Sequence, residues 1–329
     1  MMKKSFDVKE LSKKYAIIII LVLMVLVLSI MNPSFLSPAN IANLLTQVAI
    51  YGILACGMLL VIVSKGIDLS VGSVLAFSGI VAGSVSQTVD ATGKVFPQLG
   101  MAPLWVTILL ALGIGALLGA INGALIAYTG IPAFISTLGM YTAARGAALM
   151  YSDGRPVSNI NPSILVFGDK IVSVLTMPVV IYALVIVVTF VILKFTSFGK
   201  SVYAIGGNIQ AAEISGIKVK RNITLIYTYC GLLAGLCALV YIGRTGGSIQ
   251  PATATGYELT AIAATTIGGT SHSGGIGTVW GTVVGALILG VLTNGFTMLG
   301  VNAYVQQIVQ GVVIVVAVIL DMRKNKRKK

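Results

Sequence analysis

The chain has 329 residues, of which 57% are hydrophobic and only 9% are charged, and its mean hydropathy is +0.98. These values lie far outside the range of soluble globular domains and indicate a polytopic membrane protein. A formal net charge of +13 would suggest nucleic-acid binding in a soluble protein. Here the basic residues flank apolar segments, so we expect no nucleic-acid partner.

Apolar segments recur along the whole chain and predict an all-α fold of about ten transmembrane helices. The first segment has no small-residue cleavage site after it, so we expect it to remain as a span and not to be removed as a signal peptide. The eighth is short and rich in glycine. The predicted spans lie at about 15–31, 44–64, 71–89, 104–127, 133–151, 177–195, 223–243, 257–272, 277–298 and 303–320.

The positions of the basic residues predict the orientation of these spans. With the N-terminus inside, 17 of the 22 Lys and Arg residues fall in inner segments, and Arg145 lies within the fifth span. Cytoplasmic loops hold the excess of Lys and Arg in membrane proteins. Both termini, the loop 196–222 and a basic tail at 321–329 are therefore predicted to be cytoplasmic. The 17 inner residues are Lys3, Lys4, Lys9, Lys13, Lys14, Lys65, Lys194, Lys200, Lys218, Lys220, Arg221, Arg323, Lys324, Lys326, Arg327, Lys328 and Lys329.

The two halves of the chain, about 15–151 and about 177–320, are weakly similar in the same order. Residues 66–70 (GIDLS) resemble 256–260 (GYELT), and 115–120 (GALLGA) resemble 281–286 (GTVVGA). The match pairs the second to fifth spans with the seventh to tenth, an offset of five spans. Because five is odd, we expect two inverted halves within a single transmembrane domain over 1–329. Inverted repeats are typical of transporters.

Two carboxylates, Asp68 and Glu258, occupy equivalent positions in these repeats. Inverted symmetry places Asp68 at the inner mouth of the third span and Glu258 at the outer mouth of the eighth, on opposite faces of the membrane. Each carboxylate can cap the start of its helix. The alternative is a gate or a substrate contact at the two ends of a pathway.

Polar residues within the apolar spans are the other candidates for a pathway. Hydrogen bonds between helices satisfy most such groups, because a buried amide without a partner costs free energy. As a set they also suit a neutral polyhydroxyl solute, whose hydroxyl groups pair with amides and hydroxyls. The path or gate candidates are Asp68, Ser70, Asn122, Tyr257, Glu258, Asn294, Gln306 and Gln310.

Small residues in the spans predict close packing between helices and not a metal or catalytic site. Glycines recur every four residues from Gly115 to Gly123, and the three cysteines lie in apolar runs without metal or disulfide spacing. The single histidine, His272, has no carboxylate or cysteine cluster near it in the sequence. Residues 199–201 (GKS) lack the rest of a phosphate-binding loop. We therefore expect no metal, nucleotide or other cofactor on this chain.

The loop 196–222 is the longest polar interruption with concentrated positive charge. Asn208 suits the N-cap of a short helix, the following Ala-Ala-Glu run favours helix, and Gly216 suits its end. This helix is either part of a solvated connection or a docking site for a cytosolic protein, and the residues alone favour neither.

Three stretches together resemble one family: 66–73 (GIDLSVGS), 204–217 with its AIGGN start, and 256–271 from GYEL to GGTS. They resemble the ribose-type sugar permeases of bacterial ATP-binding-cassette importers, over about residues 33–321. Such permeases are dimeric subunits of the cytoplasmic membrane, driven by a separate cytosolic ATPase and supplied by an external sugar-binding protein. The resemblance implies these partners, a homodimer surrounded by lipid, and ATP and Mg bound by the ATPase.

By this resemblance the chain is not an enzyme but forms the translocation path for a monosaccharide. A ribose-like pentose is the first expectation, ahead of other monosaccharides, inositol or a signalling furanose. Ile276 and His272 depart from the family's usual residues at those positions. The resemblance assigns ATPase docking to Asn208, Ala211, Ala212, Glu213, Ser215 and Gly216.

Two other functions fit inverted repeats. An ion-coupled secondary transporter usually has an ionisable site at the membrane midplane, where this sequence offers only Arg145. A passive channel for a small neutral solute would need neither a docking helix nor a partner. Both remain alternatives to the importer.

Overall fold

The computed structural model describes residues 8–326, and this part of the chain is helical, with only isolated β-bridges and no β-strand. The prediction of an all-α polytopic membrane protein is confirmed. The α-helices of the described residues are α1 (Val8–Met31), α2 (Pro38–Val63), α3 (Val71–Ser84), α4 (Leu104–Ala124), α5 (Ala133–Tyr151), α6 (Met177–Phe195), α7 (Ser197–Gly207), α8 (Ile209–Ile214), α9 (Val219–Arg244), α10 (Tyr257–Ile267), α11 (Val279–Met298) and α12 (Ala303–Lys326).

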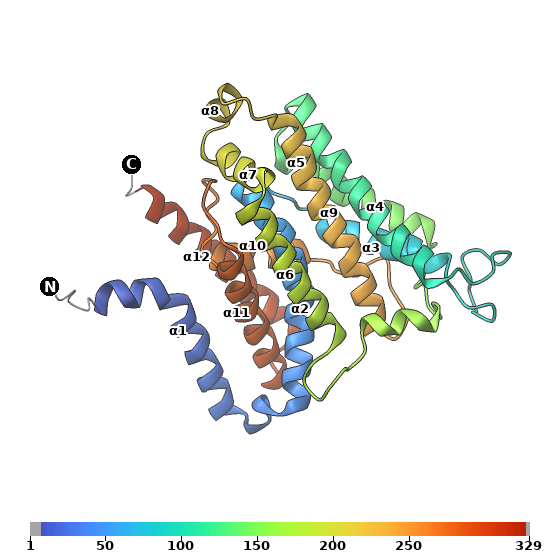
Figure 1. Ribbon diagram of the computed structural model, residues 1–329. Helices are drawn as coiled ribbons and strands as arrows, with labels where there is room; N and C mark the ends of the chain where they lie inside the picture. The colour runs from blue at the N-terminus through green and yellow to red at the C-terminus, as the bar shows by residue number, and fades with distance from the viewer. Residues whose placement is uncertain (1–7, 327–329) are drawn as a thin grey trace.

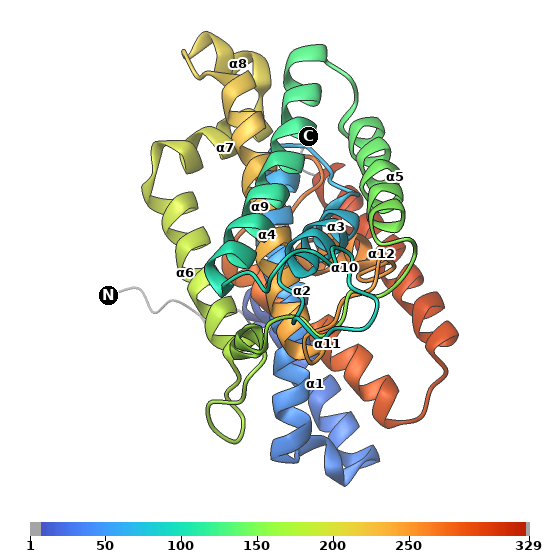
Figure 2. The same cartoon turned by 90° about the vertical axis from the view of Figure 1, so that its right-hand side faces the viewer.

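All of these helices except α7 and α8 correspond to predicted spans and form one bundle (Figures 1 and 2). Within the described residues, six are long and apolar enough to cross a membrane unaided: α2, α4 with its π-helical extension to Thr129, α6, α9, α11 and α12. The other four bundle helices, α1, α3, α5 and α10, have a shorter apolar stretch or are less apolar.

One end of the bundle, here called the basic end, gathers the connections 64–70, 196–218 and 268–278. The backbone N–H of Gly275 donates to the carbonyl of Val63 (2.8 Å), which joins the connection 268–278 to the end of α2. Helix α8 projects from this end, beyond α7 (Figure 1).

The opposite end, here called the loop end, gathers the connections 85–103 and 152–176. The N–H of Thr88 donates to the carbonyl of Asn159 (2.8 Å), and the side chain of Asn161 donates to Ala102 (3.1 Å). Successive bundle helices run alternately between the two ends, as a multi-pass protein requires.

Helices α4 and α9 share the most extensive contact in the bundle. A Cβ atom at Gly115 would lie 2.3 Å from the carbonyl oxygen of Gly231, and one at Gly119 would lie 2.2 Å from that of Tyr227. Only glycine fits at such distances, so the predicted close packing along α4 is confirmed. The three cysteines are buried and unpaired, in agreement with a packing role.

The third and eighth spans are half-length helices. The 14 residues of α3 and the 11 of α10 rise roughly 21 and 16 Å, less than the hydrocarbon thickness of about 30 Å. The expected continuations to 89 and 272 are wrong, because the chain turns after Ser84 and after Ile267.

Each half-helix follows a non-helical segment that turns back into the bundle. The first re-entrant segment, 64–70, enters from the basic end and leads into α3. The second re-entrant segment, 245–256, enters from the loop end and leads into α10. Both half-helices therefore begin inside the bundle, surrounded by longer helices (Figure 2).

Two further boundaries differ from expectation. The loop 196–222 contains α7 in addition to the predicted short helix α8, because Thr196 caps α7 by accepting a hydrogen bond from the N–H of Gly199 (3.0 Å). Helix α12 continues through the expected tail as far as Lys326. The rest of that basic tail and the basic residues before Val8 lie outside the described part of the chain.

Candidate functional site

The starts of α3 and α10 lie against each other in the interior of the bundle. A Cβ atom on Gly72 would lie 2.4 Å from the carbonyl oxygen of Ala254 and 2.5 Å from Oε2 of Glu258. Asp68 and Glu258, which are 1% and 7% exposed, also interact electrostatically. The expectation of opposite faces is therefore wrong, because the re-entrant segments carry both helix starts inward.

A buried hydrogen-bond network fixes the first re-entrant segment. Oδ1 of Asp68 accepts bonds from the backbone N–H (2.8 Å) and the hydroxyl (2.6 Å) of Ser70. The amide of Asn122 in α4 donates to that hydroxyl (2.9 Å) and accepts from Ser136 in α5 (3.4 Å). Three path candidates, Asp68, Ser70 and Asn122, thus meet in a network that joins the segment to two helices.

The carbonyl of Ile67 provides a second attachment of the same segment. The hydroxyl of Tyr227 in α9 donates to it at 3.2 Å, and that of Thr137 in α5 at 3.4 Å. No buried side-chain oxygen or nitrogen of the residues in these two attachments lacks a partner. The first segment is therefore held by neutral groups whose hydrogen bonds are satisfied.

The second re-entrant segment is held at its beginning by bonds to the connection 152–176, such as the two between the backbones of Val157 and Ile249 (both 2.9 Å), and further on by a charged side chain. Nη1 of Arg145 in α5 donates to the carbonyls of Pro251 and Thr253, the latter at 2.8 Å. Oε1 of Glu258 accepts a bond from the N–H of Gly256 (3.1 Å), so the expected capping at the helix start is present. Oε2 of Glu258 and the Nε and Nη2 atoms of Arg145 are buried without a partner.

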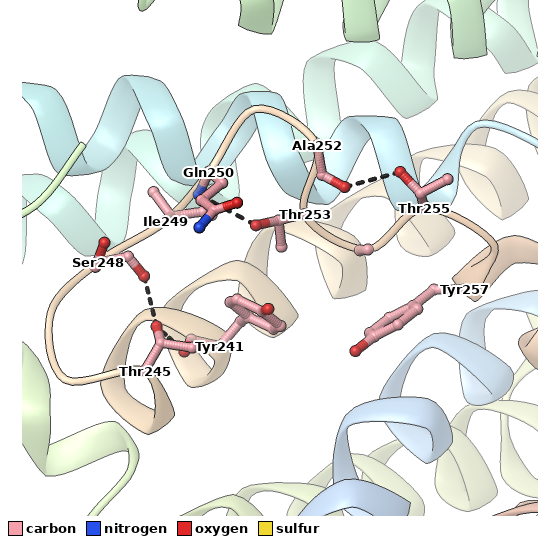
Figure 3. Close-up of a pocket in the computed structure, with 10 residues that line it drawn as sticks. Tyr241, Thr245, Ser248, Ile249, Gln250, Ala252, Thr253, Thr255 and Tyr257 are labelled. Carbon is pink, nitrogen blue, oxygen red and sulfur yellow. Dashed lines mark hydrogen bonds between the residues drawn. The ribbon is translucent and has the colours of Figure 1, made fainter. Parts of the chain in front are cut away.

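A cleft of about 440 Å³ runs along the second re-entrant segment. The segment passes over the side chains of Tyr241 and Tyr257, and short-range bonds such as Thr255 to the carbonyl of Ala252 (2.7 Å) shape it (Figure 3). Hydroxyl, amide and aromatic groups dominate the lining. The lining residues are Tyr241, Thr245, Ser248, Ile249, Gln250, Ala252, Thr253, Ala254, Thr255 and Tyr257.

A second cleft of about 350 Å³ shares Thr255 and Tyr257 with the first and extends toward α2 and α12. The rings of Tyr51 and Tyr257 pack edge to face, with centroids 5.1 Å apart. Gln310 donates to the hydroxyl of Thr260 (2.6 Å) in its wall. Together the two clefts form a groove that offers donors, acceptors and aromatic faces to a neutral polar ligand.

Two path candidates lie away from this groove. The amides of Asn294 and Asn40 exchange hydrogen bonds (2.9 and 3.0 Å) between α11 and α2. Gln306 donates to the carbonyl of Val301 (2.9 Å) at the start of its own helix. Asn294 thus acts as an interhelical tie and Gln306 as a local cap.

Sequence reasoning missed several groove residues. Tyr51 lines the second cleft, and Gln250 and Thr253 line the first. Nothing in the sequence marks Tyr51, whereas Gln307, which also lines the second cleft, belongs to the same set of glutamines in the last span as Gln306 and Gln310. The role of Arg145 in holding the second segment was also missed, although its charge within an apolar span was a signal.

Helix α8 forms as predicted. The side chain of Asn208 accepts a bond from the N–H of Ala211 (3.0 Å), and Gly216 has a φ of +80°, which favours glycine. Ala211, Glu213, Ser215 and Gly216 are exposed. Ala212 is not, because it is 3% exposed and packs with Ile205 and Val219. Ala212, which the resemblance assigns to docking with the others, therefore does not lie on the outer surface of the helix.

His272 lies at the basic end between α10 and α12. Its Nε2 pairs with the hydroxyl of Thr266 (2.8 Å), and its backbone N–H donates to Asp321 (3.1 Å). Burial lowers the pKa of His272, and the negative charge of Asp321 opposes that change. The residues 8–326 contain no group of three His, Cys, Asp or Glu side chains that suits a metal ion.

Comparison with known proteins identifies the family. Residues 40–318 match the family model described as a branched-chain amino acid transport system permease component. The ribose import permease protein RbsC of Bacillus subtilis is 44% identical over 93% of this chain and 91% of its own, and RbsC of Escherichia coli K12 is 40% identical over 94% and 93%. The galactose/methyl galactoside import permease protein MglC of E. coli K12 is 37% identical over 96% of each chain.

No solved structure gives a significant match. The match to the family model covers most of the chain, and the similarity to these relatives extends over nearly its whole length. The chain therefore belongs to this family of membrane permeases.

Proposed function

We propose that the chain is the membrane subunit of an ATP-binding-cassette importer for a monosaccharide, with ribose as the first candidate. The observation that carries the proposal is the identity of 44% and 40% to two ribose import permeases over nearly the whole chain. The polar and aromatic groove beside the second re-entrant segment supports it, because its lining suits hydroxyl groups and offers no cluster of fixed charge.

The partners follow from the same proposal. A cytosolic ATPase binds ATP and Mg and powers transport, an external binding protein delivers the sugar, and two copies of this chain form the complete path within the lipid bilayer. This chain itself binds no cofactor. The basic end faces the cytoplasm, because Lys65, Lys200 and Lys218 lie in its connections and such loops collect positive charge on the inner side.

Helix α8 is the proposed docking element for the ATPase. It projects from the basic end, and Ile214 is 88% exposed at its tip. An exposed large apolar side chain beside Ala211 and Glu213 gives a partner protein a surface to bury. Asn208, Ser215 and Gly216 set the start and end of this helix, and Ala212 anchors it to the body of the protein.

Transport assays in proteoliposomes test the function. The chain is combined with the ATPase and binding protein of its importer, and uptake of labelled ribose, galactose and leucine is measured with and without ATP. We expect ATP-dependent uptake of a sugar. Uptake of leucine without sugar uptake would favour the amino-acid substrate in the family model's description, and uptake without ATP would favour a channel or an ion-coupled transporter.

Co-purification of the ATPase tests the docking element. Ile214→Asp removes an exposed contact outside the membrane, and a loss of about 2 kcal/mol weakens association by about 30-fold. Ile276→Asp, at another exposed isoleucine of the basic end, is the matched control and should retain the ATPase. Equal retention by both variants would show that α8 is only a connector.

A further inference from the structure

Arg145 and Glu258 form an incomplete charge pair beside the second re-entrant segment. Each feels the charge of the other, yet they form no ion pair within 4 Å. Two guanidinium nitrogens of Arg145 and one carboxylate oxygen of Glu258 are buried without partners. Buried charged groups without partners are costly, so an arrangement that pairs them is favourable.

The remaining contacts of Arg145 show what opposes that pairing. Its Nη1 is bound to the carbonyls of Pro251 and Thr253, in the part of the segment that lines the first cleft. Among the described residues, no other side chain outside α10 bonds to the stretch 250–256, whose other bonds are internal, such as Gln250 N–H to Thr253 (3.1 Å). Releasing Arg145 therefore frees the cleft wall from α5.

We propose that Arg145 is a two-position latch for transport: it holds the second re-entrant segment in the present state and pairs with Glu258 when the segment moves away. The two positions exchange one set of charge-assisted bonds for another, so the change needs little net free energy. An ionisable side chain at membrane depth is expected to have such a role together with a named partner. This inference rests on the proposed transport function.

Glycine at position 72 allows a tight junction between the starts of α3 and α10. Oε2 of Glu258 occupies the space that a Cβ on Gly72 would need, so the start of α3 limits where the carboxylate can go. Tyr227 and Asn122 bond to the first re-entrant segment, which leads into α3. The α3 side of the junction is therefore fixed. Oε1 of Glu258 is bonded to the N–H of Gly256, so Oε2, which has no partner, is the oxygen to which the guanidinium can bond.

Thiol labelling of the purified chain tests the latch without any substrate. In a background with Cys56, Cys230 and Cys237 replaced by Ala, Thr253→Cys reports on the segment and Ser73→Cys on α3; both positions are buried. Arg145→Met should raise the labelling rate at Thr253→Cys by about tenfold or more, equivalent to about 1.4 kcal/mol, and leave Ser73→Cys protected. Arg145→Lys, which keeps the charge but loses the planar donor, should give an intermediate rate.

The Glu258→Gln variant separates a latch from a merely structural contact. It leaves the bonds of Arg145 to the segment in place, so labelling at Thr253→Cys should stay slow, whereas ATP-dependent sugar uptake should fall at least tenfold. Adding Arg145→Met to Glu258→Gln should cost little further uptake, because both act on one step. Slow labelling in a folded Arg145→Met or Arg145→Lys chain, or normal uptake by Glu258→Gln, would overturn the latch. Failure of the wild-type chain to take up sugar would contradict the proposed function and leave the labelling result to decide the latch.

Discussion

The two re-entrant segments occupy matching positions in the weak sequence repeat, yet they are held in different ways. Neutral donors and acceptors surround the first, and Asp68 at its end accepts two bonds from Ser70. The beginning of the second is bonded to the connection 152–176, but its 250–256 part is held by Arg145, beside the buried oxygen of Glu258 that has no partner. A satisfied network fixes a single arrangement, whereas an incomplete one leaves room for a second. The proposed latch therefore moves the segment at the loop end during transport and keeps the other in place.

The largest effect should come from breaking the packing behind the first segment. Gly119→Leu forces a side chain into the backbone of α9 beside Tyr227, which holds the carbonyl of Ile67. We expect a loss of about 3 kcal/mol or more, seen as poor yield of monodisperse protein and a lower Tm. Gly113→Leu on the same helix meets nothing within 4 Å and should behave as the wild type. A stable Gly119→Leu chain would show that this packing is not what fixes the segment.

A smaller effect is expected when one bond of the network is removed. Asn122→Ala leaves the buried hydroxyl of Ser70 without its donor and should cost about 1–3 kcal/mol of stability. Its transport per folded molecule should remain close to the wild-type rate, because the first segment is not the moving part. Gln306→Ala, which removes only a local bond, should stay within about 0.5 kcal/mol. A stable but inactive Asn122→Ala chain would reverse the roles of the two segments.

The smallest effect on stability is expected from His272, which follows the C-terminal end of α10. The pKa of His272 is lowered in the folded chain, so the unfolded chain binds more protons and stability falls as the pH drops below about 6.5. Between pH 7.5 and 5.5 the wild type should lose slightly more thermal stability than His272→Gln. Identical pH dependence of the two Tm values would show that His272 does not contribute to this end of the helix.

The sequence predicted where the helices lie and several local contacts, but not the half-length of α3 and α10 or how the two re-entrant segments converge. The close approach at Gly119 and the cap at Asn208 follow from residue type and spacing, and both are present. Repeat symmetry paired Asp68 with Glu258 but placed them at opposite mouths, whereas the structure carries both helix starts into the interior. Depth depends on where the chain re-enters the bundle, and the glycine- and threonine-rich stretches there carry no periodic pattern.

Burial on short helices was equally hard to predict. Ala212 resembles Ala211 in sequence, and only the packing of α8 on Ile205 and Val219 separates a buried alanine from an exposed one. The role of Arg145 depends on backbone carbonyls of a segment 106 and 108 residues away, which no sequence pattern specifies.

Cross-linking of the second segment tests most directly whether it moves during transport. The hydroxyls of Ser158 and Ser248 lie 2.8 Å apart and join the segment to the loop end, so the Ser158→Cys and Ser248→Cys pair can lock it there. The pair Thr46→Cys and Thr176→Cys, also from hydroxyls 2.8 Å apart, locks α2 to the start of α6 without touching either segment and serves as the control. We predict that oxidation abolishes ATP-dependent sugar uptake by the first pair, that reduction restores it, and that the control pair transports in both states. Wild-type uptake by a fully cross-linked first pair would contradict the account.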